Sequence, residues 1–326
     1  MIAGWLLGIS IAGAQVVDDI VAEVVFDAPQ VRIGEPVFFT FRVHNRGDVP
    51  LWRMVGGDYR NALGRASSYQ CELQPAQGAA LDVPDAGFNM GGIMHMAEIP
   101  PGGHTDQRLF LPNWGIPEAP GAHTLTCATE LQLTHESDFD APRTAVPVTV
   151  RADLTVLAAD SDAMGALIED LAAQAAGPDR DEALRQLARI EDARVIPFFV
   201  SQATGARAHT AIRALAKFDD DAALAGIVAA AATRAEDIEE SSAAFAEQAA
   251  ASRRLGAAQA LSASAHPGAH AVLLSMAGHR DDNIRLTVVH ALGRDKSPEA
   301  SAMLQGFQDD ASAMVAGEAA RYLRER

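Results

Sequence analysis

Methionine and histidine residues gather between positions 90 and 104, where their types suit the binding of a soft metal ion. The segment from 90 to 96 reads MGGIMHM, and the candidate ligands are Met94, His95, Met96 and His104. Thioether sulfur and imidazole nitrogen are ligands that copper accepts. The same alternation also fits a β-strand whose two methionines pack in the core while His95 faces solvent. The cluster therefore indicates either a copper site or an ordinary strand.

Neighbouring aspartates recur along the chain and indicate either calcium ligands or helix caps. Most precede a predicted helix, where an Asp side chain accepts backbone N–H groups and complements the helix dipole, so we interpret them as caps. The pair at 138 and 140 lies on a predicted loop and is the candidate for calcium, although it lacks the glycine and closing glutamate of an EF-hand loop. The groups are Asp138/Asp140, Asp179/Asp181, Asp219 to Asp221, Asp281/Asp282 and Asp309/Asp310.

Motifs of nucleophilic catalysis and of phosphate binding are missing from the sequence. No G-x-S-x-G elbow occurs, and no family signature surrounds either cysteine. The glycine pairs at 56–57 and 91–92 do not open predicted helices, so a phosphate-cradling loop is unsupported. We therefore predict no catalytic residue and no cofactor apart from the copper alternative, and we interpret the chain as non-enzymatic.

Cys71 and Cys127 are the two cysteines of the chain, and each lies in a probable strand. An even number of cysteines in an exported chain favours a disulfide between them. A pair of buried thiols is the alternative. A metal site formed by both is less favoured, because the C-x-x-C spacing of such sites is missing.

The first fourteen residues, MIAGWLLGISIAGA, form an uncharged apolar segment that ends in the small residues Ala12, Gly13 and Ala14. This pattern is typical of a signal peptide, so residues 1–14 are predicted to be removed and the mature chain to begin at Gln15. A buried N-terminal strand or helix is the alternative. A transmembrane helix needs about 20 apolar residues, and no segment approaches that length. We expect a periplasmic or extracellular protein.

The chain is acidic, with 43 Asp and Glu residues against 26 Lys and Arg and a formal net charge of −17. Because an acidic surface repels phosphate groups, nucleic acid and anionic membranes are excluded as expected partners. A length of 326 residues exceeds what one hydrophobic core usually organises. All three tryptophans precede position 150 and alanine crowds the second half, which predicts two domains of different architecture.

Residues 15–152 carry the pattern of a β-sandwich. Between 37 and 43 the side chains alternate, with Val37, Phe39, Phe41 and Val43 on one face. Short runs of the same kind follow, separated by stretches rich in turn residues, without a helical period. The further runs cover 49–52, 68–73, 108–111, 123–133 and 145–150.

Two segments of this half resemble bacterial immunoglobulin-like domains of the CARDB-like kind. The run GEPVFFTFRVHNRG from 34 to 47 is similar to their opening strand pair. The run PGAHTL from 120 to 125 is similar to a late strand, with His123 where an aromatic residue is usual. The resemblance implies an immunoglobulin-like β-sandwich and carries no information about a ligand.

Residues 153–326 repeat a helical pattern that five leucines align, and we call these the anchor leucines. Four residues before each anchor stands Ala or Val, as closely packed helices require. Seven residues before the anchor, arginine occurs in three repeats, as Arg180, Arg254 and Arg285. The anchors and their small partners are Leu187 with Ala183, Leu215 with Ala211, Leu261 with Ala257, Leu292 with Val288, and Leu323 with Ala319.

Each anchor except the last is followed by a turn with Asp or Pro and by a second predicted helix. The second helices are expected at 193–202, 222–232, 268–276 and 298–307. A helix-turn-helix unit that recurs about every 30 residues is typical of a solenoid. The form Arg-x-x-Ala-x-x-x-Leu, then Asp or Pro, then an apolar helix, resembles HEAT repeats. That resemblance implies an α-helical solenoid in a protein-binding or scaffolding protein.

One spacing between anchors, from Leu215 to Leu261, is longer than the others and contains an acidic segment at 233–252. Its alanine, serine and glutamate residues predict an extended helix that is exposed to solvent. The segment is either an acidic ridge on a binding surface or an ordinary solvated helix face.

Overall fold

The computed structural model describes residues 19–326 apart from 62, 88, 90, 178–179 and 240–241. The chain divides into two compact units, Met1–Met164 and Gly165–Arg326. The predicted signal peptide and the predicted mature terminus at Gln15 lie outside the described residues. Within the described part, no helix combines the length and the apolar character needed to cross a membrane.

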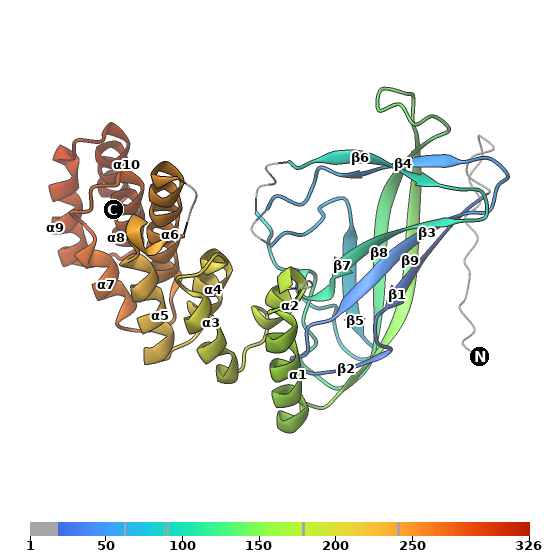
Figure 1. Cartoon of the computed structure of the whole chain (residues 1–326), viewed down its shortest axis with the longest axis horizontal. Helices are drawn as coiled ribbons and strands as arrows, with labels where there is room; N and C mark the ends of the chain where they lie inside the picture. The colour runs from blue at the N-terminus through green and yellow to red at the C-terminus, as the bar shows by residue number, and fades with distance from the viewer. Residues whose placement is uncertain (1–18, 62, 88, 90, 178–179, 240–241) are drawn as a thin grey trace. The chain divides into compact units, whose positions relative to one another are not determined.

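The first unit is built from two β-sheets that share one hydrophobic core (Figure 1). The smaller sheet has the antiparallel order β1-β3-β7, and the larger has the order β2-β9-β8-β4-β6, with β5 paired to β8. The smaller sheet contains β1 Ile20–Phe26, β3 Phe38–Asn45 and β7 His104–Phe110. The larger contains β2 Gln30–Arg32, β4 Leu51–Gly56, β5 Gln70–Pro75, β6 Met94–Ile99, β8 Gly121–Thr134 and β9 Thr144–Leu157.

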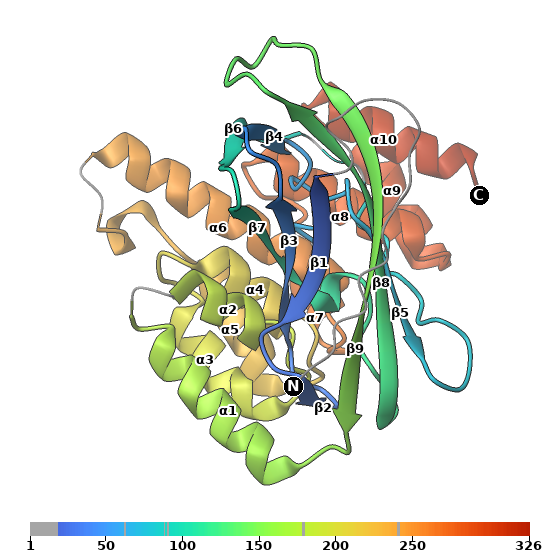
Figure 2. The ribbon, with the colours of Figure 1, turned by 90° about the vertical axis from the view of Figure 1, so that its right-hand side faces the viewer.

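Alternation along the strands fills the core as predicted. Val37, Phe39, Phe41 and Val43 are all buried, and they pack against inward residues of the larger sheet in one cluster. The long strands β8 and β9 run side by side along the larger sheet (Figure 2). A disulfide joins Cys71 of β5 to Cys127 of β8, and these two residues lie directly opposite each other in the antiparallel pair of β5 and β8. The predicted immunoglobulin-like sandwich is confirmed by this arrangement of strands.

The boundary expected between 152 and 153 needs correction, because it falls inside β9. Asp153 pairs with Thr124 of β8, and the strand continues to Leu157. Leu154 and Val156 maintain the alternation and are buried in the sandwich core. The change to helical structure therefore comes later, at α1 Ser161–Gln174.

The second unit is an array of helix pairs, as the repeats predicted. The anchor helices α4, α6, α8 and α10 form one row and α3, α5, α7 and α9 the other (Figure 1). The anchor helices are α2 Arg180–Leu187, α4 Ala208–Leu215, α6 Ala243–Ala263, α8 Asp282–Arg294 and α10 Ala313–Arg324. The second helices are α3 Ile196–Gln202, α5 Asp221–Ala231, α7 Ala269–Ser275 and α9 Pro298–Gly306.

Burial confirms the register of the repeats with one exception. All five small partners and the first four anchor leucines are buried. Leu323 is only partly buried, although its partner Ala319 is fully buried. The reason is that α10 packs against α8 and α9 on one side, so the end of its apolar face is less completely covered.

The acidic segment at 233–252 differs in part from the expectation. Its second half is helical and continuous with α6, so the segment lengthens an anchor helix at its N-terminal end. Ala244 and Phe245 are exposed as predicted, whereas Ala246 and Ala250 are buried in the packing between helices. The segment is therefore a half-buried extension and not a fully solvated helix.

Replacing Ala257 by leucine is expected to lower the free energy of unfolding by about 1–3 kcal/mol, because Ala257 has no exposed surface and extra atoms overpack the helix contact. The same change at Ala244, on the exposed side of the same helix, is expected to be nearly neutral. Thermal melts followed by far-UV circular dichroism compare the two variants. Equal destabilisation would show that the helix register is misassigned.

Candidate functional site

The methionine and histidine residues of the first unit lie on different surfaces. Met94 and Met96 point outward from β6, while His95 shares the strand face of the buried residue Ile99. His104 lies in the other sheet, where it pairs with His44 of β3. The alternation is confirmed, but the interpretation of the methionines as core residues is wrong, because β6 turns its other face to the core. The structure does not bring the four candidate ligands together.

A different methionine joins Met96 on the outer face of the larger sheet. Met54 of β4 lies directly opposite Met96 in the antiparallel pair, and both side chains are half-buried. Met94 packs over Gly57, where an added Cβ would meet its sulfur at 2.8 Å. Proximity in sequence does not indicate Met54, because the pairing of β4 with β6 spans a long loop. The outer face therefore carries the thioethers of Met54, Met94 and Met96, whereas His95 lies on the opposite face of β6.

Two of the aspartates, Asp220 and Asp281, cap helices as predicted, and Asp179 lies outside the described residues. Asp220 accepts the backbone N–H groups of Ala222 and Ala223, and Asp281 accepts that of Asn283. Asp138 accepts the N–H of Asp140 in an exposed loop. Among the described residues, no group of three or more His, Cys, Asp or Glu side chains is placed to hold a metal ion.

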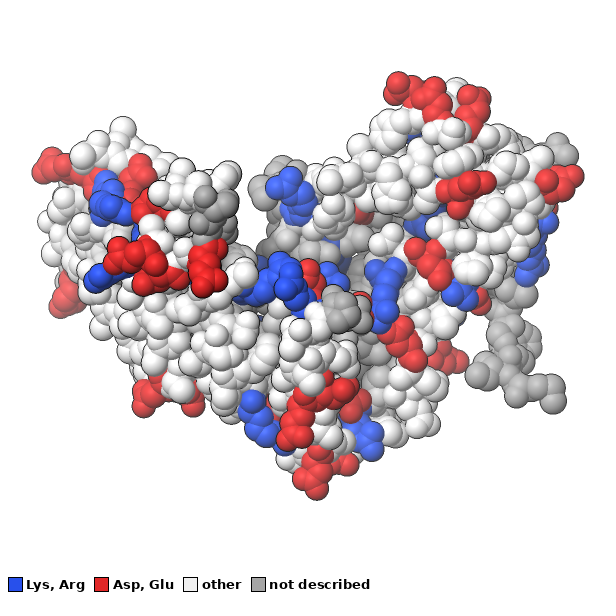
Figure 3. Space-filling model, viewed as in Figure 1, with Lys and Arg blue, Asp and Glu red and all other residues white. Residues whose placement is uncertain are grey.

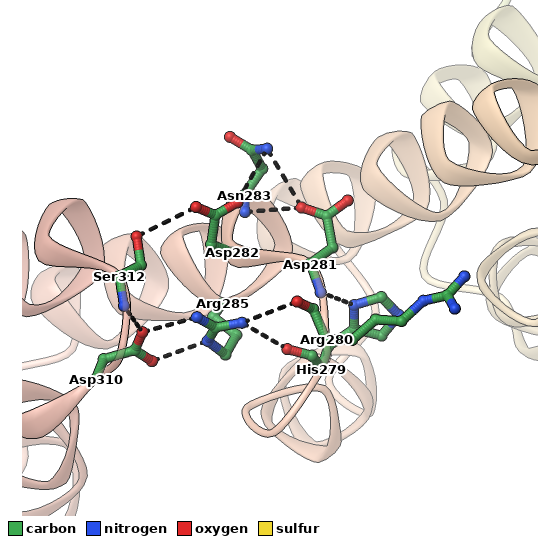
Figure 4. Close-up of polar contacts among 8 residues, drawn as sticks. All are labelled: His279, Arg280, Asp281, Asp282, Asn283, Arg285, Asp310 and Ser312. Carbon is green, nitrogen blue, oxygen red and sulfur yellow. Dashed lines mark hydrogen bonds and ion pairs between the residues drawn. The ribbon is translucent and has the colours of Figure 1, made fainter.

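The most developed polar cluster joins the N-terminal ends of α8 and α10 (Figure 4). Arg285 donates Nε to Oδ2 of Asp310 at 2.8 Å and Nη2 to Oδ1 at 2.7 Å, which makes a bidentate ion pair. The side chains are 14% and 9% exposed. Nη1 of Arg285 also donates to the carbonyl oxygens of His279 and Arg280. A single guanidinium thus links two consecutive repeats and the loop before α8.

We call this ion-pair cluster around Arg285 and Asp310 the joint. Further hydrogen bonds extend the joint on both sides. The Ser312 hydroxyl lies 3.2 Å from Oδ2 of Asp282, and Oδ1 of Asp310 accepts the backbone N–H of Ser312. Toward α6, Glu247 accepts hydrogen bonds from both Arg254 and Arg280. Glu247 comes from the extension of α6, so this acidic segment takes part in the joint between repeats.

The electrostatics of the joint favour a fixed charge state. The guanidinium of Arg285 lowers the pKa of Asp310, and Asp310 in turn raises the pKa of Arg285. Burial, followed by the nearby charge of Arg254, lowers the pKa of His279. The neutral ring accepts the backbone N–H of Asp281 at Nδ1. Every charged group therefore has a structural partner, and the cluster holds repeats in register without the geometry of a nucleophile and base.

A second set of contacts joins the C-terminal ends of successive anchor helices. Nζ of Lys217 donates to the carbonyl oxygen of Ala188, and Arg294 donates to that of Ser262 in the same relation. In each case the donor stands two residues after one anchor leucine and the acceptor one residue after the preceding anchor. Cations at helix C-termini also complement the helix dipole. These contacts fix the spacing along the row of anchor helices.

A comparison with protein families matches the C-terminal part of the helical unit. Residues 246–324 match the family model of HEAT repeats. The matched range begins within α6 and ends in α10, so it includes the joint at Arg285 and Asp310. The predicted HEAT-like character is confirmed for these residues. No curated protein matches the chain.

Several solved structures align with part of the chain at low identity. The CARDB domain of a Pyrococcus furiosus protein, in complex with di-metal ions, aligns at 9% identity over 43% of this chain and 88% of that one, with a TM-score of 0.21. The sporulation control protein Spo0M of Bacillus subtilis aligns at 11% identity over 48% and 54%, with a TM-score of 0.22. AvmM, which catalyses macrocyclization in alchivemycin A biosynthesis, aligns at 15% identity over 48% and 98%, with a TM-score of 0.23. These values support no statement about activity.

Proposed function

We propose that the chain is an exported, non-enzymatic protein that binds or scaffolds another protein through the row of anchor helices in its helical unit. The observation that carries this proposal is the match of residues 246–324 to HEAT repeats, together with the continuity of the row. Helix α4 packs on α6, α6 on α8 and α8 on α10, so their outward faces join into one surface. Solenoids present extended surfaces of this kind to protein partners.

The joints between repeats support the same proposal. A repeat buries its apolar face only against its neighbours, so the array keeps one surface shape only if the repeats stay in register. The ion pair between Arg285 and Asp310 and the contacts of Lys217 and Arg294 fix that register at both ends of the anchor helices. A rigid row reduces the entropy that binding would otherwise cost.

Affinity capture tests the proposal with the full chain. The tagged protein is expressed in its native host, isolated from the envelope fraction, and analysed by quantitative mass spectrometry against a tag-only control. We expect one protein to be recovered in near-equimolar amount. Recovery of background proteins alone, at far below equimolar amount, would contradict a protein-binding role.

Export rests on the apolar segment at 1–14 and is supported by the disulfide, which forms and persists outside reducing compartments. Mass analysis of the native protein is expected to find Gln15, or its cyclised form, as the first residue. An intact Met1 in a cytoplasmic fraction would show that the localisation is wrong.

Copper binding on the sandwich is the second candidate function. The pairing of Met54 with Met96, beside Met94, favours it because thioethers prefer Cu(I). Titration of the purified protein with Cu(I) under anaerobic conditions is expected to show binding that Met96→Leu abolishes. Equal affinity of the two proteins would exclude this face as the site.

A further inference from the structure

Arg53 of β4 is a charged residue that points into the sandwich, between its two sheets. It alternates with Met54 of the outer face, it stands opposite the core residue Leu133 of β8, and it is 4% exposed. We propose that Arg53 anchors a binding site for the carboxylate group of a ligand that enters between the sheets. This site lies in the first unit and is independent of the helical surface in the proposed function.

The charge of Arg53 has no acidic partner within the part of the chain that the structure describes. Nη2 of Arg53 donates to the hydroxyl of Tyr69, whereas the buried Nη1 has no hydrogen-bond partner. Burial raises the pKa of Tyr69, so its hydroxyl stays neutral and leaves the guanidinium charge uncompensated. Asp58 also acts on Tyr69 through its charge, but its Oδ2 accepts the backbone N–H of Ser68. Because a buried charge without an ion partner is costly, an anionic ligand would be a favourable partner for Arg53.

The space between the sheets is open to solvent beside Arg53. Val55 and His95 lie opposite each other in β4 and β6 on the inward side, yet Val55 is half-buried and His95 is exposed. Gln107 of β7, the strand partner of the buried Phe41, is also only half-buried. An inward residue stays accessible only where the opposite sheet does not cover it, so the sandwich is open along its outer strands β6 and β7 (Figure 1). Val55 is two residues along the strand from Arg53, a distance of about 7 Å that an arginine side chain can reach across.

Aromatic contacts connect Arg53 with the smaller sheet. Its guanidinium carbon lies 5.9 Å from the centroid of the Tyr69 ring, and this ring packs edge-on against that of Phe41 with the centroids 5.1 Å apart. Phe41 in turn stands opposite Gln107. The site therefore combines one buried cation, an amide group on the other sheet and two aromatic rings, which is the mixture of few polar groups and apolar walls that small ligands need.

These groups favour a carboxylate that carries a short apolar group. A guanidinium binds a carboxylate bidentately, and one carboxylate neutralises the one buried charge. A phosphate dianion would leave excess negative charge inside a chain of net charge −17, whose acidic side chains are spread over the face that Figure 3 shows. A free small carboxylate and the terminal carboxylate of a polypeptide share this chemistry.

Thermal unfolding of the full-length protein in sodium propionate tests the proposal, with sodium chloride at equal ionic strength as the reference. Fluorescence of Trp52 and Trp114 reports on the first unit. Above its dissociation constant, propionate is expected to raise the unfolding midpoint by about 3–6 °C for each tenfold increase in concentration, because it binds only the folded state. R53M is expected to lose this rise, and R53K, which cannot bind bidentately, to keep a smaller one. The matched control, R46M, removes an exposed arginine of the same unit and should behave like the wild type.

Circular dichroism confirms that each variant is folded. If R53M is not, R53M/Y69F replaces it, because this variant removes the donor and the acceptor together. An equal rise in R53M and in the wild type would overturn the proposal, as would an equal effect of propionate and chloride. An equal effect of the uncharged propionamide or a larger effect of inorganic phosphate would also overturn it, since neither is a carboxylate.

A dipeptide identifies the source of the carboxylate. Acetyl-Gly-Leu with a free C-terminus is compared with its C-terminal amide and with propionate in the same melts. A larger rise with the free acid than with propionate, and none with the amide, assigns the site to a polypeptide terminus. A rise no larger than that with propionate assigns it to a free small carboxylate. Because these melts follow the first unit alone, their outcome leaves the proposed function of the helical unit unaffected.

Discussion

Replacing both Cys71 and Cys127 by alanine is expected to lower the free energy of unfolding of the sandwich by about 4 kcal/mol. The bond closes a loop with a sequence separation of 56, and its removal restores the freedom of that loop in the unfolded chain. Both residues are buried, one on each of the paired strands β5 and β8, so their replacement also leaves a small unfilled volume.

Denaturant titration followed by tryptophan fluorescence measures this loss, because Trp52 of β4 and the buried Trp114 both belong to the first unit and report on it. Far-UV circular dichroism in the same titration reports mainly on the helical unit, which we expect to unfold unchanged. Wild-type protein treated with a reductant is the matched control and should lose a similar amount. If reduction leaves the fluorescence midpoint unchanged, the bond does not stabilise the sandwich.

The variant Asp310→Asn is expected to lower the free energy of unfolding of the helical unit by about 2 kcal/mol. It leaves the guanidinium of Arg285, which is 14% exposed, without its carboxylate partner. The expected cost lies between the values for exposed and for fully buried ion pairs, because the two side chains keep some solvent exposure at the ends of their helices. The matched control, Glu325→Gln, makes the same chemical change in an exposed pair with Arg321 and should cost less than about 0.5 kcal/mol.

The cost of Asp310→Asn is expected to depend on pH in one direction. Hydrogen bonding to Arg285 lowers the pKa of Asp310 in the folded protein below its ordinary value. The carboxylate therefore contributes its full stabilisation above the ordinary pKa of about 3.9 and loses it as the pH falls through the lower folded value. Denaturant titrations of wild type and variant should differ at neutral pH and converge in acid. A constant difference across this range would contradict the ion pair.

Local periodicity was sufficient to predict most of the fold. A period of two identified β3, because Phe39 and Phe41 alternate with less buried neighbours over a whole strand. The anchor leucines identified the helix pairs, because each helix must bury a face against its neighbour. The predicted domain boundary falls inside β9, because Leu154 and Val156 continue the strand pattern to Leu157.

Contacts between distant segments could not be predicted in the same way. Arg285 is a repeated feature of the sequence, but its partner Asp310 lies 25 residues further and is set by how the next repeat packs. The sequence does show where both residues stand relative to their anchor leucines, because Asp310 precedes its anchor by 13 residues and Arg285 precedes its own by seven. Met54 is not predictable for a related reason, because strand pairing and not sequence distance places it beside Met96.

Photocrosslinking in cells tests most directly the claim that the row of anchor helices binds a partner. A photoreactive amino acid replaces one exposed residue at a time, at His209 of α4 and Gln259 of α6, and at Ala271 of α7 and Ala302 of α9 as matched positions on the second helices. The account predicts a specific crosslinked protein from the two anchor-helix positions and none from the two second-helix positions. Crosslinks confined to Ala271 and Ala302 would contradict it.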